Sequence, residues 1–334
     1  MIARARSHGS VDSVSPASCR ARLPAVALGD RVRIVTRSHG EIAATVAAID
    51  GRGVSLVPHA PVDGIAIGDP VTTLAEAPAL HLGTALLGRA IDGPLSAVRR
   101  ADGIARVPVT RPFWTGVRAI DGLLTIGVGA RIGVIARPGL GKSTLLRQIV
   151  ARADVDAAVV ALIGERNRES TEWFADIDDH LTVVSAPSDR PAAVRVQAAW
   201  DAAAQAAELR ARGLDVLLVI DSVARFAAAA RECAVAAGEP VGRGGYPASV
   251  FADLARLLEM GGPVARGSIT IVASVLVDGD ERDPVCEAAR SLLDGHVVLC
   301  AERAAAGHFP AIDVPASVSR TMAAVAAIVR LTLA

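Results

Sequence analysis

Aromatic residues are scarce in this sequence, and charge of neither sign is in excess. Phe, Trp and Tyr make up only 3% of the 334 residues, and 35 Lys and Arg balance 35 Asp and Glu, so the formal net charge is zero. Proteins that hold nucleic acid along a groove use a basic field and aromatic stacking platforms. The composition therefore argues against nucleic-acid binding as a global property and leaves only local basic patches open.

Cysteines are also few. The four of them, Cys19, Cys233, Cys286 and Cys300, lie far apart and form no Cys-x-x-Cys pair. This spacing fits neither a zinc site nor a disulfide framework, so a reducing cytosol is the simplest compartment.

Long hydrophobic runs are missing as well. No apolar segment approaches the ~18 residues of a membrane span, and the longest, such as residues 157–163, suit buried strands of a parallel sheet. The first 22 residues carry arginines among serines without the apolar core of a secretory signal. We expect residues 1–24 to form a flexible tail, with transient contact to acidic lipid headgroups as the alternative.

The sequence does contain a phosphate-binding loop at residues 136–144, which read Ala-Arg-Pro-Gly-Leu-Gly-Lys-Ser-Thr. A strand pattern (131–135) precedes it and a helical pattern (145–150) follows. Backbone N–H groups at the helix start point at phosphate oxygens, Lys142 neutralises the β and γ phosphates, and Ser143 is placed to ligate Mg²⁺. The strict pattern begins with glycine where this chain has Ala136, and a chance Gly-Lys-Ser turn is the alternative. The residues expected to bind the nucleotide are Arg137, Pro138, Gly139, Leu140, Gly141, Lys142, Ser143 and Thr144.

The chain is expected to form two folded units. Residues 25–92 show short alternating apolar runs punctuated by Gly and Pro, which predicts a small N-terminal β-barrel. Residues 93–114, with several Pro, Gly and Arg, are expected to be a linker. Residues 115–322 alternate apolar strands with alanine-rich helices, the pattern of an α/β core with a mostly parallel sheet and helices on both faces.

Two acidic residues follow buried strands and are expected at the same sheet edge as the loop. Asp221 ends the strand 216–220, where a carboxylate can hold the Mg²⁺ shell through water. Glu165 follows the strand 159–163, where it can orient an attacking water and accept its proton. The alternatives are an acid that begins the next loop for Asp221 and a solvated helix start for Glu165.

Further segments, in chain order, are similar to the ATPases of bacterial type III protein export, the injectisome and flagellar enzymes related to the catalytic subunits of rotary ATP synthases. They include Gly-Glu-Arg-Asn-Arg-Glu (164–169), Gly-His-Phe-Pro-Ala-Ile-Asp (307–313) and Ala-Ser-Val-Ser-Arg (316–320). The similarity spans most of residues 115–322, and the barrel segment with residues 87–89 is also similar. The other segments that carry it are 115–125, the phosphate loop, 188–190, 221–226, 237–240, 249–251 and 291–296.

This resemblance implies a RecA-like P-loop NTPase core that assembles as a homohexamer. It implies hydrolysis of ATP with Mg²⁺ to energise chaperone release, unfolding and export of proteins through a type III secretion system. The implied partners are the export gate, a central stalk, a peripheral regulator, secretion chaperones and their substrates, without nucleic acid. The implied location is the cytoplasmic face of the bacterial inner membrane, with peripheral membrane association.

The resemblance also assigns residues. Glu165 matches the family's catalytic glutamate, and Arg166 would steady the γ-phosphate or couple to the neighbouring subunit. Arg320 matches the arginine finger that reaches into the adjacent subunit's site; taken alone it would be an exposed loop arginine. Phe309 matches the aromatic residue against the adenine, with a core phenylalanine as the alternative. For Glu169, a salt bridge with Arg166 or Arg168 is expected.

The departures from the family pattern leave rival hypotheses. The stretch 87–116 looks shorter than in the family, and residues 323–334 are interpreted as the remnant of a truncated C-terminal helical domain. This puts contacts with stalk and cargo in doubt. The rivals are a rotary ATP synthase subunit, a ring-shaped RNA translocase, and a degenerate, non-hydrolysing ring component that binds nucleotide. The sequence does not distinguish an injectisome from a flagellar system.

Overall fold

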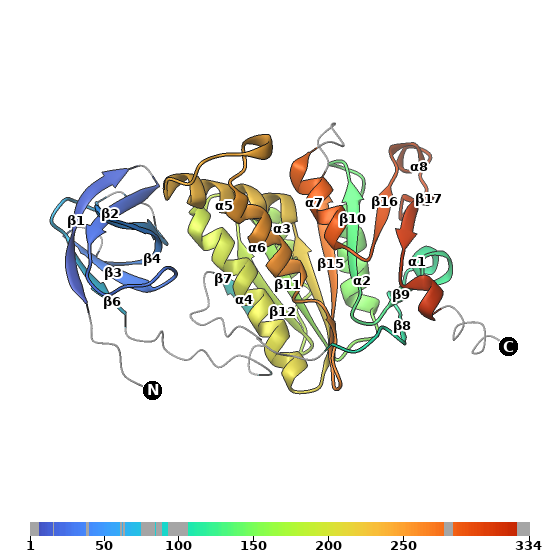
Figure 1. The fold of residues 1–334 in the computed structure, drawn as a ribbon. Coiled ribbons are helices and arrows are strands. Elements are labelled where there is room, and N and C mark those ends of the chain that lie inside the picture. The colour runs from blue at the N-terminus through green and yellow to red at the C-terminus, as the bar shows by residue number, and fades with distance from the viewer. Residues whose placement is uncertain are drawn as a thin grey trace.

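The computed structural model describes residues 7–15, 17–37, 40–60, 62, 64–74, 84, 106–276 and 283–325, and the backbone of 89–92. These residues form a β-barrel beside a larger α/β unit (Figure 1). A hydrogen bond joins the two, because the Ser18 hydroxyl of the barrel donates to the Ala236 carbonyl oxygen at 3.1 Å. None of the described helices combines the length and the apolar character needed to cross a bilayer.

The barrel is closed, with strand order β1-β2-β5-β4-β3-β6. Alternate residues such as Val32, Ile34 and Leu56 fill its interior, as the period of a strand requires. The expectation of a flexible tail over residues 1–24 is wrong for 8–15 and 18–22, which form two of the strands, while residues 1–6 and 16 lie outside the described part. The strands are β1 (His8–Ser15), β2 (Ser18–Arg22), β3 (Arg31–Thr36), β4 (Gly40–Asp50), β5 (Gly53–Pro58) and β6 (Pro70–Thr73).

The α/β unit is built on a sheet in the order β17-β16-β10-β15-β13-β11-β12-β7. Adjacent strands from β7 to β16 along this order pair in parallel, and β17 is antiparallel to β16. This confirms the predicted mostly parallel α/β core. The strands are β7 (Arg89–Asp92), β10 (Arg131–Ala136), β11 (Ala157–Ile163), β12 (Leu181–Ala186), β13 (Asp215–Asp221), β15 (Ser268–Leu276), β16 (Gly295–Leu299) and β17 (Ile312–Ser319).

Helices cover both faces of the sheet, so its central strands are apolar at consecutive positions. In β11, Val159 and Ala161 pack toward α4 to α7, whereas Val160 and Leu162 pack toward α1 to α3. Figure 1 shows α4, α5 and α6 together over one face. The helices are α1 (Arg118–Leu123), α2 (Lys142–Arg152), α3 (Asn167–Phe174), α4 (Ala192–Ala211), α5 (Val223–Ala236), α6 (Ala248–Leu258), α7 (Pro284–Leu292) and α8 (Ala301–Ala305).

Two expected boundaries differ from the structure. Residues 89–92 were assigned to the barrel, but as β7 they pair in parallel with β12 at the edge of the large sheet. The expected linker 93–114 ends in structure, since Phe113 of β8 (Pro112–Phe113) pairs with β9 (Ile126–Gly127) and is buried in the core. Residues 93–105 and 326–334 lie outside the described part, so the linker start and the C-terminal remnant stay predictions.

The buried ring of Phe113 generates a stability prediction. Phe113 is 1% exposed, whereas its neighbour Trp114 is 37% exposed. Phe113→Ala removes a fully buried ring and leaves a cavity, so we expect it to lower the free energy of unfolding by about 3–5 kcal/mol. Trp114→Ala is the control and should cost about 1 kcal/mol or less. Urea denaturation measures both values, and equal small losses would show that this segment is peripheral.

Candidate nucleotide-binding and catalytic site

The candidate site lies at the carboxyl edge of the sheet, where the central strands end. The phosphate loop follows β10, Glu165 follows β11 and Asp221 closes β13. Because these strands are parallel, their carboxyl ends meet at one edge of the sheet. β10 lies between β15 and β16, which come later in the chain, so the loop occupies a topological switch point, the usual place for a ligand in such sheets.

The backbone of the phosphate loop is turned by two glycines. Gly139 has φ 84° and Gly141 has φ 82°, in the left-handed region that favours glycine. Gly141 is the N-cap of α2, so the first N–H groups of that helix have no intrahelical acceptor and face the loop. Ala136 is still a buried strand residue, paired with Leu276 of β15. Alanine in place of the first glycine of the motif therefore falls where the backbone needs no left-handed turn.

A buried cluster of charges lies directly behind the loop. The ammonium of Lys142 donates to Asp221 Oδ1 and lies 3.8 Å from Glu165 Oε1. The Ser274 hydroxyl of β15 donates to the same Asp221 oxygen at 2.6 Å. Arg225 of α5 places its Nε 3.2 Å from Glu165 Oε1 and donates through Nη1 to the Gly164 carbonyl oxygen. The structure thus brings together Lys142, Asp221 and Glu165, which the sequence placed at one edge.

Burial controls the protonation of Glu165. The residue is only 2% exposed, and this desolvation, with the negative charge of Asp221, raises the pKa of its carboxyl to about 7. The nearby positive charges of Lys142 and Arg225 lower the pKa but do not offset the burial. A carboxyl with a pKa near neutrality can both accept and release a proton at physiological pH.

Oxygen atoms of three side chains surround the start of α2. Asp221 Oδ2 is buried and has no hydrogen-bond partner among the described residues. The Ser143 hydroxyl donates to Glu169 Oε2 at 3.4 Å, whereas Arg168 pairs with Glu172 at 3.6 Å. Glu169 thus contacts the phosphate-loop serine, in place of the expected salt bridge with an arginine. Hydroxyl and carboxylate oxygens are the donors that Mg²⁺ prefers, so this set fits the expected ion.

Phe309 and Arg166 lie on the solvent side of this cluster. A side-chain carbon at Gly141 would lie 3.7 Å from the Phe309 ring, so the ring borders the phosphate loop. Phe309 is 66% exposed, which excludes the alternative of a core phenylalanine. Arg166 is the exposed N-cap of α3, directly after Glu165.

Arg320 lies at the other end of the sheet. It directly follows Ser319, which pairs with Gly295, and Gly295 aligns with Ile132 near the start of β10. The phosphate loop begins after Ala136, so four residues of strand, about 13 Å, separate the two levels. Arg320 is exposed and is not brought to its own chain's phosphate loop.

Sequence reasoning missed two members of the buried cluster. From the sequence alone, Arg225 would be an interface cation or a solvated surface residue of an alanine-rich helix, yet it contacts Glu165. Ser274 was not considered, although a lone hydroxyl in the apolar run of β15 is a visible signal. Arg243, for which the sequence allows the same two readings, pairs with Glu287 at the surface.

The strand, glycine loop and helix, with Lys142 and Asp221 behind them, define a RecA-like P-loop NTPase. Residues 116–319 match the family model described as "ATP synthase alpha/beta family, nucleotide-binding domain". The chain belongs to this family, within the branch of type 3 secretion and flagellum-specific ATPases. The predicted class of protein, an ATPase with this fold, is confirmed.

Similar proteins come from both branches of this group. The chain is 41% identical to the SPI-2 type 3 secretion system ATPase of Salmonella typhimurium, over 93% of this chain and 76% of the relative. It is also 41% identical to the flagellum-specific ATP synthase of Treponema pallidum, over 93% and 75% of the two chains.

Two solved structures from enteropathogenic E. coli share the fold. The assembled type III secretion ATPase EscN matches with a TM-score of 0.84 at 40% identity, over 95% of this chain and 82% of that chain. The same ATPase in complex with its central stalk EscO matches with a TM-score of 0.83 at 40% identity, over 95% and 81%. At this identity the likeness extends beyond the fold to the family.

The raised pKa of Glu165 predicts a pH-dependent stability of the nucleotide-free protein. The ordinary pKa is 4.5 and the folded-state pKa about 7, so the folded protein binds the extra proton in this window and loses stability as the pH rises through it. Glu165→Gln cannot ionise and avoids this loss. We expect its free energy of unfolding to exceed that of the wild type by roughly 2–3 kcal/mol at pH 8, and by little at pH 5.

Chemical denaturation at both pH values, with a chelator present, measures this difference. Glu172→Gln is a suitable control, because the Glu172 side chain is 47% exposed and its removal should give no comparable pH-dependent gain. If Glu165→Gln and wild type lost stability in parallel between pH 5 and pH 8, the carboxyl would be ionised throughout and the raised pKa would be wrong.

Proposed function

We propose that this chain hydrolyses MgATP in a homohexameric ring and that hydrolysis energises chaperone release, unfolding and export of proteins through a type III secretion system. The observation that carries the proposal is the buried cluster of Lys142, Asp221 and Glu165 behind an open phosphate loop. Binding a nucleotide requires the loop and the lysine alone. A buried glutamate with a pKa near 7 is what hydrolysis adds.

The phosphate loop provides the binding half of the site. The backbone of residues 137–141 and the N-terminus of α2 face the phosphates, and Lys142 exchanges its contact with Asp221 for the β and γ phosphate oxygens. Ser143 and Thr144, at the start of α2, line the same side, and Phe309 offers its exposed ring to the adenine.

The side chains that would hold Mg²⁺ are Ser143 directly and Asp221 through water. The unpaired Asp221 Oδ2 supports this, because a buried carboxylate oxygen without a donor is unfavourable until a cation or water satisfies it. When bound, the ion neutralises charge on the phosphates during transfer. Glu169, now the partner of the Ser143 hydroxyl, would lose this contact if Ser143 held the ion.

Glu165 provides the catalytic half. Its carboxylate orients the attacking water and accepts its proton, which a pKa near 7 permits at physiological pH. Arg225 fixes the carboxylate from the side of α5, and exposed Arg166 steadies the γ-phosphate region or contacts the neighbouring subunit. Positive charge beyond Lys142 and the metal must come from elsewhere.

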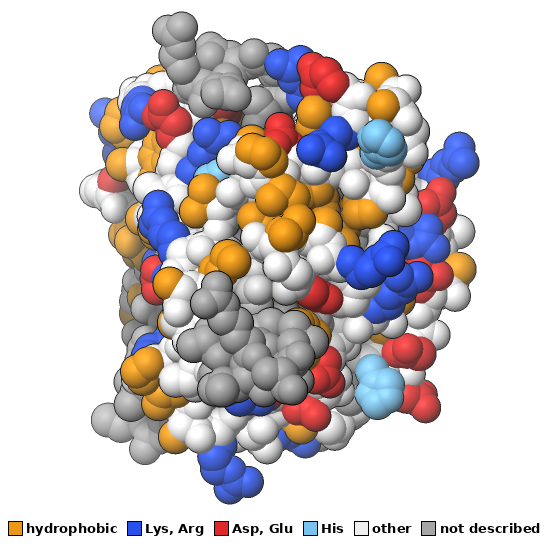
Figure 2. Space-filling model, turned by 90° about the vertical axis from the view of Figure 1, so that its right-hand side faces the viewer, with side chains coloured by type: hydrophobic (Ala, Val, Ile, Leu, Met, Phe, Trp, Pro, Cys, Tyr) orange, Lys and Arg blue, Asp and Glu red, His pale blue; other side chains and the backbone are white. Residues whose placement is uncertain are grey.

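Arg320 supplies that charge in our proposal, to the site of an adjacent subunit. Its place at the opposite level of the sheet from its own loop favours action between subunits. Figure 2 looks onto the side where β17 and α1 lie and shows hydrophobic side chains gathered at its centre. Two exposed hydrophobic residues belong to these elements, Leu123 in α1 and Val318 in β17. A surface of this kind suits a contact with a second copy.

The partners follow from the relatives. EscN is described as assembled, and in complex with its central stalk EscO, so we propose a homo-oligomer with a stalk partner for this chain too. The export gate, a peripheral regulator and secretion chaperones complete the proposal, at the cytoplasmic face of the bacterial inner membrane. A relative from a secretion system and one from a flagellar system are each 41% identical to this chain. The proposal therefore covers both systems.

The two halves of the site can be separated by mutation. Lys142→Ala removes the charge that holds the β and γ phosphates, so nucleotide-induced stabilisation and hydrolysis should fall together. Glu165→Gln keeps the shape but removes the base, so MgATP should still raise the Tm while hydrolysis drops by ~10² or more. Thermal shift and phosphate release measure both. Stabilisation without hydrolysis in the wild type would favour the non-hydrolysing alternative, and wild-type turnover in Glu165→Gln would place the base elsewhere.

A mixing experiment tests the shared site. Arg320→Ala should bind MgATP as tightly as wild type and hydrolyse it ~10³-fold or more slowly, the loss known for arginine fingers. Rings mixed with Lys142→Ala subunits should recover part of the activity, because some interfaces pair an intact Lys142 with an intact Arg320. Native mass spectrometry verifies that mixed rings form. Mixed rings no more active than either parent would make Arg320 a local structural residue.

A further inference from the structure

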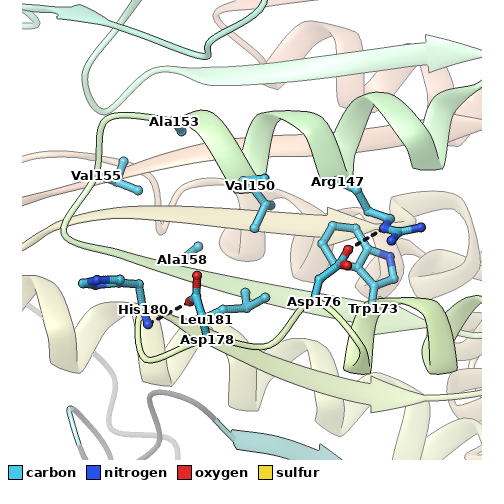
Figure 3. Close-up of a pocket in the computed structure, with 11 residues that line it drawn as sticks. Arg147, Val150, Ala153, Val155, Ala158, Trp173, Asp176, Asp178, His180 and Leu181 are labelled. Atoms are coloured by element: carbon cyan, nitrogen blue, oxygen red, sulfur yellow. Dashed lines mark hydrogen bonds and ion pairs between the residues drawn. The ribbon is translucent and has the colours of Figure 1, made fainter.

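A cavity of about 220 Å³ lies at the far end of the α/β unit from the phosphate loop, between α2, α3 and the first residues of β11 and β12 (Figure 3). Its apolar lining includes Val150, Ala158, Trp173 and Leu181. Trp173 is 2% exposed and packs in the core. The cavity is therefore a recess in the apolar core layer that opens to solvent, and it is separate from the nucleotide site.

The rim of this cavity carries both positive and negative side chains, and only some of the acids are paired with a cation. Arg147 forms ion pairs with two acids: its Nε donates to Asp176 Oδ2 at 2.6 Å and its Nη1 donates to Glu172 at 3.3 Å. These carboxylates raise the pKa of Arg147 above its usual value. The single positive charge of Arg147 is thus shared between two acids, and it does not neutralise the other acids of the rim.

Asp178 is the second acid that lines the cavity, and it has no paired cation in the described part of the chain. Its Oδ1 accepts a hydrogen bond from the His180 backbone N–H at 2.9 Å, and Figure 3 shows its carboxylate directed from the α3–β12 loop toward α2. No Lys or Arg of the described residues forms an ion pair with Asp178. Of the other cations on α2 and α3, Arg168 pairs with Glu172. Arg152, the last residue of α2, is exposed, and the stem of its side chain lies against Gly116.

Further acids continue the negative surface beyond the cavity mouth. Asp154, Asp156 and Asp179 are exposed, and each adjoins a cavity-lining residue in the chain. The His180 ring lies 3.4 Å from the Asp156 carbonyl oxygen, which holds the two rim segments together. The negative surface is thus longer than the cavity itself.

The volume of the cavity and the residues that line it indicate which kind of group it can bind. Pockets for drug-sized ligands and cofactors enclose about 300–1,000 Å³, so a recess of about 220 Å³ holds one side chain rather than a nucleotide. An apolar floor with an unpaired carboxylate at the rim matches an aliphatic stem that ends in a cation, the form of arginine and lysine. Acids around the mouth favour a longer basic segment over a single small cation.

We propose that this cavity receives an arginine or lysine side chain from a basic segment of another polypeptide. The proposal does not rest on hydrolysis, since the cavity adjoins the amino ends of β11 and β12 and the phosphate loop follows the carboxyl end of β10.

The occupancy of the cavity can be read directly from Trp173. The chain has only three tryptophans, so fluorinated tryptophan gives three fluorine NMR signals, and Trp173→Phe identifies the one from the cavity. The probe is a short synthetic peptide with two arginines flanking a leucine. Its matched control has citrulline at both positions, which keeps the shape and removes the charge. We expect the arginine peptide to shift the Trp173 signal at concentrations at which the citrulline peptide does not.

Three variants locate the binding. Asp178→Asn should weaken the arginine peptide about fivefold, the effect of one partly exposed ion pair. Asp179→Asn, its neighbour outside the cavity, should change the affinity less than twofold. Ala151→Phe places a ring at the mouth from an exposed position of α2 and should weaken binding about tenfold or more, whereas Ala211→Phe at the exposed end of α4 should not.

Three results would contradict the proposal. Equal binding of the arginine and citrulline peptides would make the recess a non-specific apolar site. Equal effects of Asp178→Asn and Asp179→Asn would reduce the attraction to a diffuse negative field. If free agmatine shifted the Trp173 signal with the affinity of the peptide, the occupant would be a small organic cation instead of a polypeptide. Hydrolysis rates of the same variants should equal that of the wild type.

Discussion

The buried ion pair between Lys142 and Asp221 is the interaction on which the site depends. An ammonium and carboxylates are costly to remove from water unless they lie beside each other and their remaining atoms find partners. That condition requires the phosphate loop, the end of β13 and the turn after β11 to meet at one level of the sheet, which the parallel register provides. The apolar strands and their two helical layers serve to hold three strand ends in this alignment.

The same cluster shows how the protein stays folded before substrate arrives. Lys142 is neutralised by Asp221, Glu165 is about half protonated at neutral pH, and Arg225 balances the charge of its ionised form. In the function proposed above, phosphate oxygens take over the contact of Lys142 and a metal ion takes over that of Asp221. In the nucleotide-free site the charged side chains are therefore already in position, and each is held by an ion pair or hydrogen bond with another residue of the site.

The site could be predicted from the sequence where a residue directly follows a strand or belongs to a contiguous motif, as for Lys142, Glu165 and Asp221. Arg225 and Ser274 were missed because their side chains reach the cluster from elements whose position depends on packing. The α/β core was predictable from its long apolar runs. Strands β1 and β2 were not, since closing the barrel pairs β1 with β6, some sixty residues away, and local alternation there is interrupted by polar residues.

Strand β17 joins two features that lie at opposite levels of the sheet. Phe309, beside the phosphate loop, precedes the strand, and Arg320 follows it. The strand pairs with β16 at both ends, Ile312 with Leu299 and Ser319 with Gly295, and its pairing is irregular between Asp313 and Val318. Because both ends of β17 are hydrogen-bonded to β16, the positions of Phe309 and Arg320 depend on the same pair of strands. In the ring proposed above, the two ends of this one strand therefore serve two different nucleotide sites, that of their own chain and that of the neighbour.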